Sequence, residues 1–238
     1  MKKLTTAVLI TAVTLGSISC KKDVVGSGPV ITLTRPVQNF TGIDLRMNGY
    51  VYYTKDSITK LEITAKESIH GMLETSVVNN TLVIRYNNGK TYDADGSIRI
   101  NVSAPNVNGF VLNSSGSIIS MSDLQPATLF LRSNGSGDIA LKGIVTNSID
   151  AESNVSGRIT AAAGTAQSEL LKTDASGKID LSGIDAKTVT AKSTGSGDIK
   201  IKVADHLDAT INGSGSIYFS GMPILSSHIS GSGHLIRF

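Results

Sequence analysis

The sequence predicts an all-β protein that folds as a right-handed parallel β-helix, also called a β-solenoid, with coils of about 20 residues. Three observations predict this fold. A short phrase, Ser-Gly-x-Ile, recurs through the C-terminal half of the chain at nearly constant spacing. Aliphatic residues alternate with other residues on both sides of each copy. The 238 residues include 24 glycines and no tryptophan, which is typical of a fold with many turns and small side chains.

The repeat is defined by its glycine, which occurs in seven copies separated by 21, 20, 20, 20, 18 and 18 residues. A serine precedes each of these glycines, and an isoleucine or leucine lies two residues after it. Because a unit this short cannot bury its own apolar face, we expect successive coils to stack and to form one aliphatic column. The seven repeat glycines are Gly116, Gly137, Gly157, Gly177, Gly197, Gly215 and Gly233.

A second predicted strand precedes each repeat glycine by four to eight residues. Apolar pairs such as Leu129 and Leu131 mark this strand. In the fourth copy the apolar pair shifts to Leu170 and Leu171, which puts Glu169 at an outward position. Each coil is therefore expected to contain a strand, a Ser-Gly corner, a second strand and a second turn, and the 18-residue coils are expected to lose two residues at that second turn. The glycines at the corners indicate backbone angles that other residues rarely adopt.

The N-terminal part, residues 30–105, is less regular but still strand-like. Its strand candidates alternate apolar and polar residues or carry β-branched side chains. We interpret this part as irregular early coils that close one end of a single solenoid domain spanning residues 30–238, with residues 106–238 forming the regular coils. The alternative is a small separate β-domain that ends near Pro105.

Residues 1–19 are predicted to form a lipoprotein signal peptide, because a basic start is followed by an apolar stretch and a small-residue exit. Cys20, the single cysteine of the chain, follows directly and resembles the lipidated cysteine of a bacterial lipobox. Acyl chains on Cys20 would anchor the protein to the outer membrane, on its periplasmic or its surface-exposed face, through a tether of residues 20–29. The alternative is an ordinary secreted protein with a free thiol.

The mature chain is expected to be nearly neutral, because removal of the two lysines in the signal peptide leaves 20 basic and 19 acidic residues. Such a surface argues against a nucleic-acid partner. The four histidines have no metal-ligand spacing, and the sequence contains no phosphate-binding loop and no nucleophile elbow. We therefore expect no catalytic residue, no metal site and no cofactor.

Among the outward charged residues, Asp180 and Asp198 are the pair best placed for chemistry. They belong to adjacent coils, and an offset of two residues would put them about 8 Å apart, a separation found in inverting glycosidases. A lysine is expected beside each carboxyl group, however, and a positive neighbour lowers its pKa when an acid catalyst needs a raised one. Asp180 and Asp198 are therefore candidates for surface binding, as are Tyr50, Tyr52 and Tyr53, whose rings can stack on sugars or anchor a partner.

Several segments resemble one known family. They are Arg35–Leu45, Leu61–Ala65, Thr81–Ile84 and the Ser-Gly-x-Ile coils. In these segments the chain resembles the family named "putative auto-transporter adhesin, head GIN domain", in the form of a Bacteroidota-type lipoprotein. The resemblance implies a single-stranded right-handed β-helix and an adhesive or envelope role, and it supplies no catalytic residue.

These observations indicate a non-catalytic surface or envelope lipoprotein that acts as an adhesin-like binding or structural module. Its expected partners are the membrane, through the lipid anchor, and a glycan or a protein on the cell surface or matrix. The alternative function is a polysaccharide-active enzyme, a lyase or hydrolase, on the same β-helix scaffold.

Overall fold

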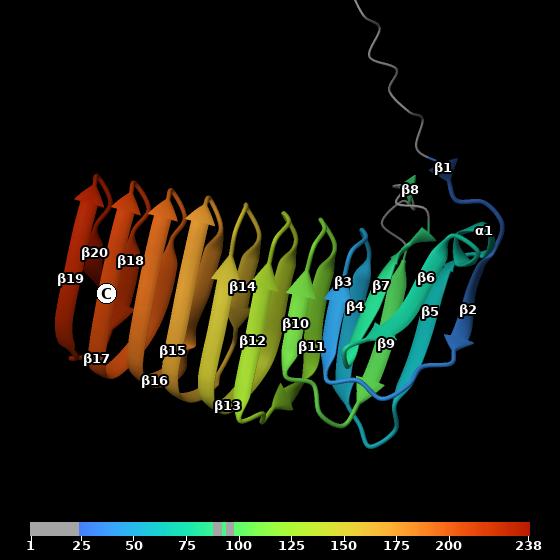
Figure 1. The fold of residues 1–238 in the computed structure, drawn as a ribbon, viewed down its shortest axis with the longest axis horizontal. Coiled ribbons are helices and arrows are strands. Elements are labelled where there is room, and N and C mark those ends of the chain that lie inside the picture. The colour runs from blue at the N-terminus through green and yellow to red at the C-terminus, as the bar shows by residue number, and fades with distance from the viewer. Residues whose placement is uncertain (1–23, 88–91, 94–97) are drawn as a thin grey trace, which may run out of the picture.

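The computed structural model describes residues 24–87, 92–93 and 98–238. The predicted signal peptide and Cys20 therefore lie outside the described residues. The described chain is an all-β solenoid of about six turns with coils of about 20 residues, as the repeat predicts. Its strands lie side by side along one long axis, with the N-terminal strands at one end and the C-terminal strands at the other (Figure 1). The right-handed direction of the coils stays a prediction.

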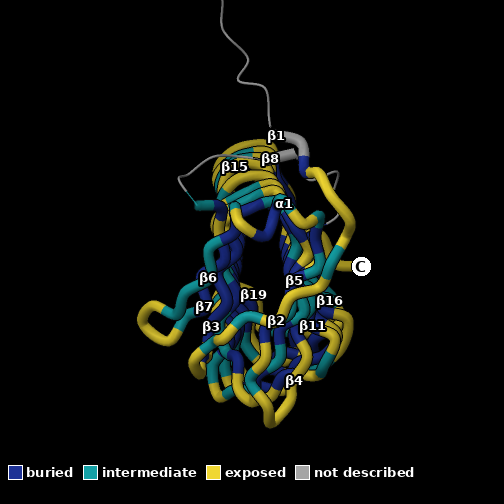
Figure 2. The backbone as a smooth tube through the Cα atoms, turned by 90° about the vertical axis from the view of Figure 1, so that its right-hand side faces the viewer, coloured by how far each residue is buried: buried dark blue, intermediate teal, exposed yellow. Residues whose placement is uncertain are grey.

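The regular coils contribute strands to two parallel sheets that face each other across the core (Figure 2). Sheet A contains β3 (Gly42–Leu45), β10 (Gly109–Leu112), β12 (Thr128–Ser133), β15 (Gly164–Ala175), β19 (Ile224–Gly231) and the second halves of β13 (Asp138–Ser153), β16 (Lys178–Gly195) and β17 (Ile199–Gly213). Sheet B contains β4 (Tyr50–Lys55), β11 (Ser117–Leu124), β14 (Arg158–Ala161), β18 (Ile217–Ser220), β20 (Leu235–Arg237) and the first halves of β13, β16 and β17. The two sheets meet at the Ser-Gly edge, where the repeat glycines lie, and at the turn edge, which the second turns form.

The core between the sheets contains the predicted aliphatic column. The isoleucines that follow the first six repeat glycines are stacked in register on sheet B, and each is at most 1% exposed. Burying one such side chain stabilises the fold by about 1.5–3 kcal/mol, so stacking between coils holds the chain together. The prediction that the 18-residue coils lose two residues at the second turn is confirmed, because the register between β16 and β17 shifts between Leu181 and Thr188.

The Ser-Gly edge requires glycine because successive coils approach closely there. A Cβ atom added at Gly137 would overlap the carbonyl oxygen of Gly116 in the preceding coil, and one added at Gly197 would overlap the carbonyl oxygen of Gly177. The expectation that unusual backbone angles require these glycines is wrong, because no repeat glycine has a positive φ. Positive φ angles occur two residues earlier, for example at Gly195 (φ 107°).

Glu169 points into the core, so the prediction of an outward Glu169 is wrong. It lies in register between Ile149 and Val189 of the neighbouring coils and is only 3% exposed, whereas Leu170 is 40% exposed. A slip of one residue would turn every side chain of β15 to the opposite face, so the register of the sheet overrides the preference of one carboxyl group for water. Neither carboxyl oxygen has a hydrogen-bond partner among the described residues, and burial raises the pKa of Glu169 to about 8.

The N-terminal strands continue both sheets but include antiparallel pairs. The strands that do so are β2 (Val30–Arg35), β5 (Lys60–Lys66), β6 (Leu73–Val78), β7 (Thr81–Tyr86) and β9 (Arg99–Ala104). β1 (Val24–Val25) and β8 (Tyr92–Asp93) pair in parallel as a separate two-stranded sheet, and α1 (Glu67–His70) is a short helix. β7 is parallel to β3 and β9 is parallel to β4, whereas β2–β5, β5–β9 and β6–β7 are antiparallel.

α1 crosses from β5 in sheet B to β6 in sheet A at the N-terminal end of the solenoid. The Arg35 guanidinium at the end of β2 donates hydrogen bonds to the carbonyl oxygens of His70 and Leu73, and so links the two sheets. The helices of the described segments include none that is long and apolar enough to cross a membrane. That residues 30–238 form a single solenoid domain stays a prediction, with a separate β-domain that ends near Pro105 as its alternative.

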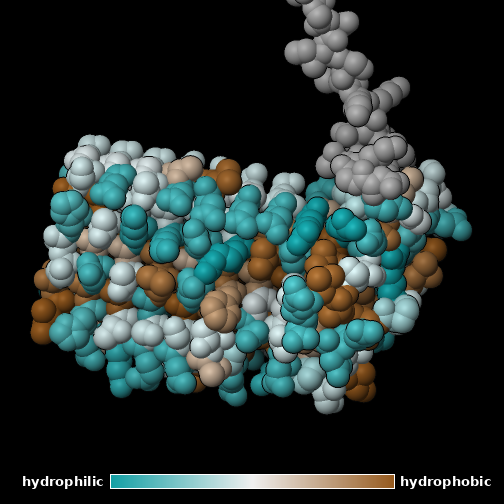
Figure 3. Space-filling model, in the orientation of Figure 1, coloured by the Kyte–Doolittle hydropathy of each residue, from teal (hydrophilic) through white to brown (hydrophobic). Residues whose placement is uncertain are grey.

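The C-terminal coil is uncovered on its outer side. Every residue of β19 is exposed, including Ile224 (69%) and Leu225 (50%), because no later coil of the described chain covers this strand. Brown, apolar atoms lie along this edge of the molecule in Figure 3, as they also do over parts of the N-terminal half. The two ends of the solenoid therefore differ, since α1 and the antiparallel strands cover the N-terminal end.

Candidate binding site

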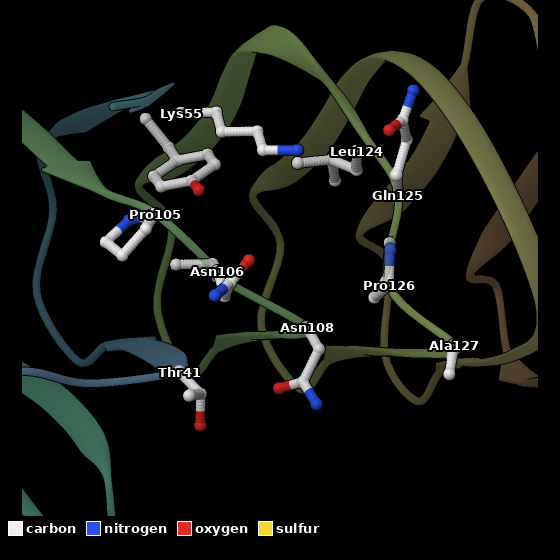
Figure 4. Close-up of a pocket in the computed structure, with 11 residues that line it drawn as sticks. Thr41, Lys55, Pro105, Asn106, Asn108, Leu124, Gln125, Pro126 and Ala127 are labelled. Carbon is white, nitrogen blue, oxygen red and sulfur yellow. The ribbon is translucent and has the colours of Figure 1, made fainter. Parts of the chain in front are cut away.

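Two neighbouring cavities open along the turn edge, and we call the surface that they form the turn groove. The first, the lysine cavity, has a volume of about 300 Å³ and is shown in Figure 4. It is lined by Thr41, Tyr53, Lys55, Pro105, Asn106, Val107, Asn108, Leu124, Gln125, Pro126 and Ala127. The second, the amide cavity, has a volume of about 490 Å³ and is lined by Gln125, Pro126, Ala127, Val145, Thr146, Asn147, Thr165 and Gln167. The residues 125–127 line both cavities.

The lysine cavity exists because two turns diverge. The turn 105–108 connects β9 to β10, and the turn 125–127 connects β11 to β12. β10 and β12 are neighbours in sheet A, but in sheet B β4 lies between β9 and β11. The two turns are therefore adjacent at sheet A and separated at sheet B, and the end of β4, with Tyr53 and Lys55, lies in the gap.

Tyr53 forms part of the wall of this cavity from within the core, so the prediction that Tyr53 belongs to a surface cluster is wrong. Its side chain is 0% exposed, its hydroxyl donates to the Ala104 carbonyl oxygen at 2.9 Å, and its ring packs edge-on against Phe110. Burial raises the pKa of Tyr53 to about 12. Strand alternation explains this orientation, since Val51 and Tyr53 point inward while Tyr50 and Tyr52 point outward.

The amide side chains of the turn groove differ from those of the Ser-Gly edge. At the Ser-Gly edge, Asn154 donates to Asn134, Asn134 donates to Asn113, and Asn113 donates to Asp44, over distances of 2.7–2.8 Å. In the turn groove the amides have no side-chain hydrogen bond to any described residue, so their donors and acceptors are available to a ligand. These amides are Asn106, Asn108, Gln125, Asn147 and Gln167.

Lys55 is the one charged residue that lines either cavity in the described structure. Its backbone N–H donates to the Ser122 hydroxyl at 3.0 Å, which fixes the end of β4 against β11. Its ammonium group forms no ion pair with a described residue. No described carboxylate lines the two cavities, so the turn groove is neutral except for one positive charge.

The outward tyrosines lie on sheet B, outside the turn groove. The guanidinium carbon of Arg99 lies 4.1 Å from the centre of the Tyr52 ring, so a cation covers this ring, and Arg99 also donates to Asn101. Tyr50 is 43% exposed. Of the three predicted tyrosines, Tyr50 alone offers a ring that is largely open to a partner.

Residues 39–223 match the model of a family described as "Putative auto-transporter adhesin, head GIN domain". The chain belongs to this family. The head GIN domain described above is similar to a "putative adhesin" from Bacteroides fragilis, with a TM-score of 0.85, 27% identity, and coverage of 90% of this chain and 100% of that chain. No curated protein matches the sequence.

Two further solved structures show the same fold at lower identity. A "putative adhesin" from Parabacteroides merdae has a TM-score of 0.71 and 20% identity, covering 91% of this chain and 99% of that chain. A "putative lipid binding protein" from Parabacteroides distasonis has a TM-score of 0.75 and 23% identity, covering 91% of this chain and 100% of that chain. The names of the three structures are thus two putative adhesins and one putative lipid binding protein.

Asp180 lies in β16 on sheet B of the head GIN domain and Asp198 directly precedes β17 on the next coil, and neither lines the turn groove. Asp180 accepts hydrogen bonds from the backbone and the hydroxyl of Ser182, at 3.1 and 2.6 Å. Asp198 accepts from the Ser216 backbone at 3.0 Å and lies 4.0 Å from the Lys178 ammonium. Both carboxylates therefore already have protein partners. Across the described segments, no three His, Cys, Asp or Glu side chains gather closely enough to hold a metal ion.

Proposed function

We propose that this head GIN domain is a non-catalytic binding module that holds a glycan along the turn groove. One observation carries the proposal: five groove amides have no side-chain hydrogen bond to the described protein. An amide both donates and accepts hydrogen bonds, as a sugar hydroxyl does, so a row of free amides suits a chain of sugars. The groove crosses the turns of four coils, which at about 4.8 Å per coil is roughly 14 Å.

The lining of the groove supports binding without turnover. Glycoside hydrolysis commonly uses two carboxyl groups on either side of the scissile bond. Neither groove cavity has a carboxylate among its described lining residues, and Asp180 and Asp198 lie elsewhere with partners of their own. The adhesin descriptions of the family and of the B. fragilis structure point in the same direction.

The test uses the mature chain with Cys20→Ala as the parent. A double variant, Asn147→Ala with Gln167→Ala, removes two amides of the amide cavity. Glycan binding of parent and variant is measured first on an array and then by calorimetry. A hydrogen bond contributes about 1 kcal/mol, so the double variant is expected to bind roughly 10- to 30-fold more weakly. Asn212→Ala, an exposed amide at the Ser-Gly edge, is the matched control and should bind like the parent. Release of reducing sugar or unsaturated uronate from the bound glycan would instead favour the enzyme.

A lipid is the second candidate ligand. Five lining residues of the lysine cavity are apolar or prolines, and one neighbour of the same fold is described as a lipid-binding protein. The apolar residues are Pro105, Val107, Leu124, Pro126 and Ala127. Fatty acids and phospholipid vesicles, included in the same binding experiments, distinguish the two ligand classes, because loss of the amides weakens a glycan complex far more than an acyl-chain complex.

We also propose that Cys20 is lipidated and that the lipid anchors the module to the outer membrane. The position of the single cysteine directly after a predicted signal peptide supports this proposal. The full chain expressed in a bacterium is expected in the membrane fraction with an acyl mass increment, and the Cys20→Ala chain in the soluble fraction. A parent chain that carries no acyl group and stays soluble would show an ordinary secreted protein.

A further inference from the structure

We propose that the lysine cavity is a subsite for the carboxylate of an acidic sugar, such as a uronic acid, at one end of the bound glycan. This inference rests on the proposed glycan binding and names the class of sugar that the groove selects. It follows from the position of Lys55, from the absence of competing carboxylates, and from the shape of the cavity wall.

Lys55 is held at the cavity without an internal counter-ion. Two acidic residues lie close to it in the fold or the chain, and both have other partners. Asp56 accepts hydrogen bonds from the Ile58 backbone at 3.0 Å and from the Ser57 hydroxyl at 3.3 Å. Asp123 lies 4.0 Å from the Lys142 ammonium. The positive charge of Lys55 is therefore available to an anionic ligand.

The rest of the cavity fits one sugar ring. Its volume of about 300 Å³ lies at the lower end of the range of ligand pockets. Pro105 and Pro126 offer apolar surface for the C–H face of a pyranose. In Figure 4 the Asn106 side chain lies between the two turns, whereas the Asn108 and Gln125 side chains extend outward from them, so Asn106 is the amide that can reach a hydroxyl of a sugar in this cavity. The Tyr53 ring in the wall is fixed by its hydrogen bond to Ala104.

The two cavities together define a pattern of charge along the ligand. They share residues 125–127 and are therefore adjacent, as a sugar chain bound across both would require. The lysine cavity carries one positive charge, whereas the amide cavity has only neutral described lining residues. The ligand that fits is thus a glycan in which an acidic residue is followed by neutral residues, rather than a polymer of uniform negative charge.

The experiment compares two oligosaccharide probes by calorimetry on the mature chain with Cys20→Ala. One probe is an oligosaccharide with a single terminal glucuronate followed by N-acetylglucosamine residues, and the other is the same oligosaccharide with its carboxyl group reduced to an alcohol. We expect the acidic probe to bind about fivefold more tightly at low salt, and this preference to shrink as salt rises. Lys55→Met should abolish the preference and Lys55→Arg should retain it.

Lys172→Met removes the same charge from an exposed position on sheet A and should leave the preference intact. Thermal melting of each variant shows whether it is folded, and Lys55→Arg keeps the test valid if Lys55→Met is not. Equal binding of the two probes, or an unchanged preference in Lys55→Met, would overturn the carboxylate subsite while leaving the glycan groove in place. If no glycan bound, acidic or neutral, the proposed glycan-binding function itself would be wrong.

Discussion

Replacing Glu169 by valine is expected to stabilise the protein by roughly 3 kcal/mol at pH 7 and to remove a dependence of stability on pH. Valine has nearly the volume of the glutamate side chain, and it matches Val189 in the next coil. Burial raises the pKa of Glu169 from 4.5 to about 8, so between these pH values the folded chain holds a proton that the unfolded chain releases. The contribution to stability is thus fully present below pH 4.5 and is lost as the pH rises to about 8.

The measurement is urea unfolding of the parent and the variant between pH 4.5 and 8. The free energy of unfolding of the variant should exceed that of the parent by an amount that grows with pH, by up to about 1.4 kcal/mol per pH unit. Glu169→Gln should also lose the pH dependence, because it cannot ionise, and Glu67→Gln, at an exposed position of α1, should keep the parental slope. A constant difference between parent and Glu169→Val across this range would show that Glu169 is hydrated in solution.

Replacing Gly137 by alanine is expected to lower the free energy of unfolding by about 4 kcal/mol or more, or to prevent folding. The new methyl group would overlap the carbonyl oxygen of Gly116, and both backbones are held in register by the pairing of β11 with β13. The coils can relieve this overlap only by separating, which would break hydrogen bonds and open the aliphatic column.

Gly71→Ala is the matched control for this prediction, because a Cβ atom at Gly71 meets nothing within 4 Å and its φ is −72°. Its free energy of unfolding should lie within about 1 kcal/mol of the parent value. If Gly137→Ala unfolded at the parental urea concentration, the close approach of coils at the Ser-Gly edge would not exist in solution.

The regular coils could be predicted from the sequence because their spacing is nearly constant. The repeat glycines set the period, and the aliphatic residues two positions later marked the inward face of sheet B. The same spacing would have placed Glu169 correctly, since it lies 20 residues from both Ile149 and Val189. The hydrophobicity of Leu170 misled the prediction, although the register of a stacked sheet is stronger than the preference of one residue.

The orientation of Tyr53 in β4 is also set by the register of the sheet. Val51 stacks on Ile118 and Ile100, which fixes Val51 and Tyr53 as inward residues. A cluster of three tyrosines in the sequence therefore divides into two outward rings and one core ring. Strand alternation alone predicts this division.

The turn groove could not have been predicted from the sequence. Its lysine cavity depends on β4 lying between β9 and β11, and that order arises from pairings between segments more than 40 residues apart. The antiparallel pairs of the N-terminal part have the same origin. Nor does the sequence distinguish an amide that bonds to its neighbour, such as Asn134, from one that has no protein partner, such as Asn147.

The strand pairings at the N-terminal end differ from those of the regular coils in the length of chain between the paired residues, and this length affects the rate of folding. Residues paired between β3 and β10 lie 67 positions apart in the sequence. Residues paired between neighbouring regular coils lie about 20 positions apart, and this separation is roughly 0.08 of the chain length. Closing the long loops is the slow, entropically costly step, and each later coil then adds to a ready edge with a short loop. We therefore expect the N-terminal pairings to form more slowly than the stacking of the regular coils.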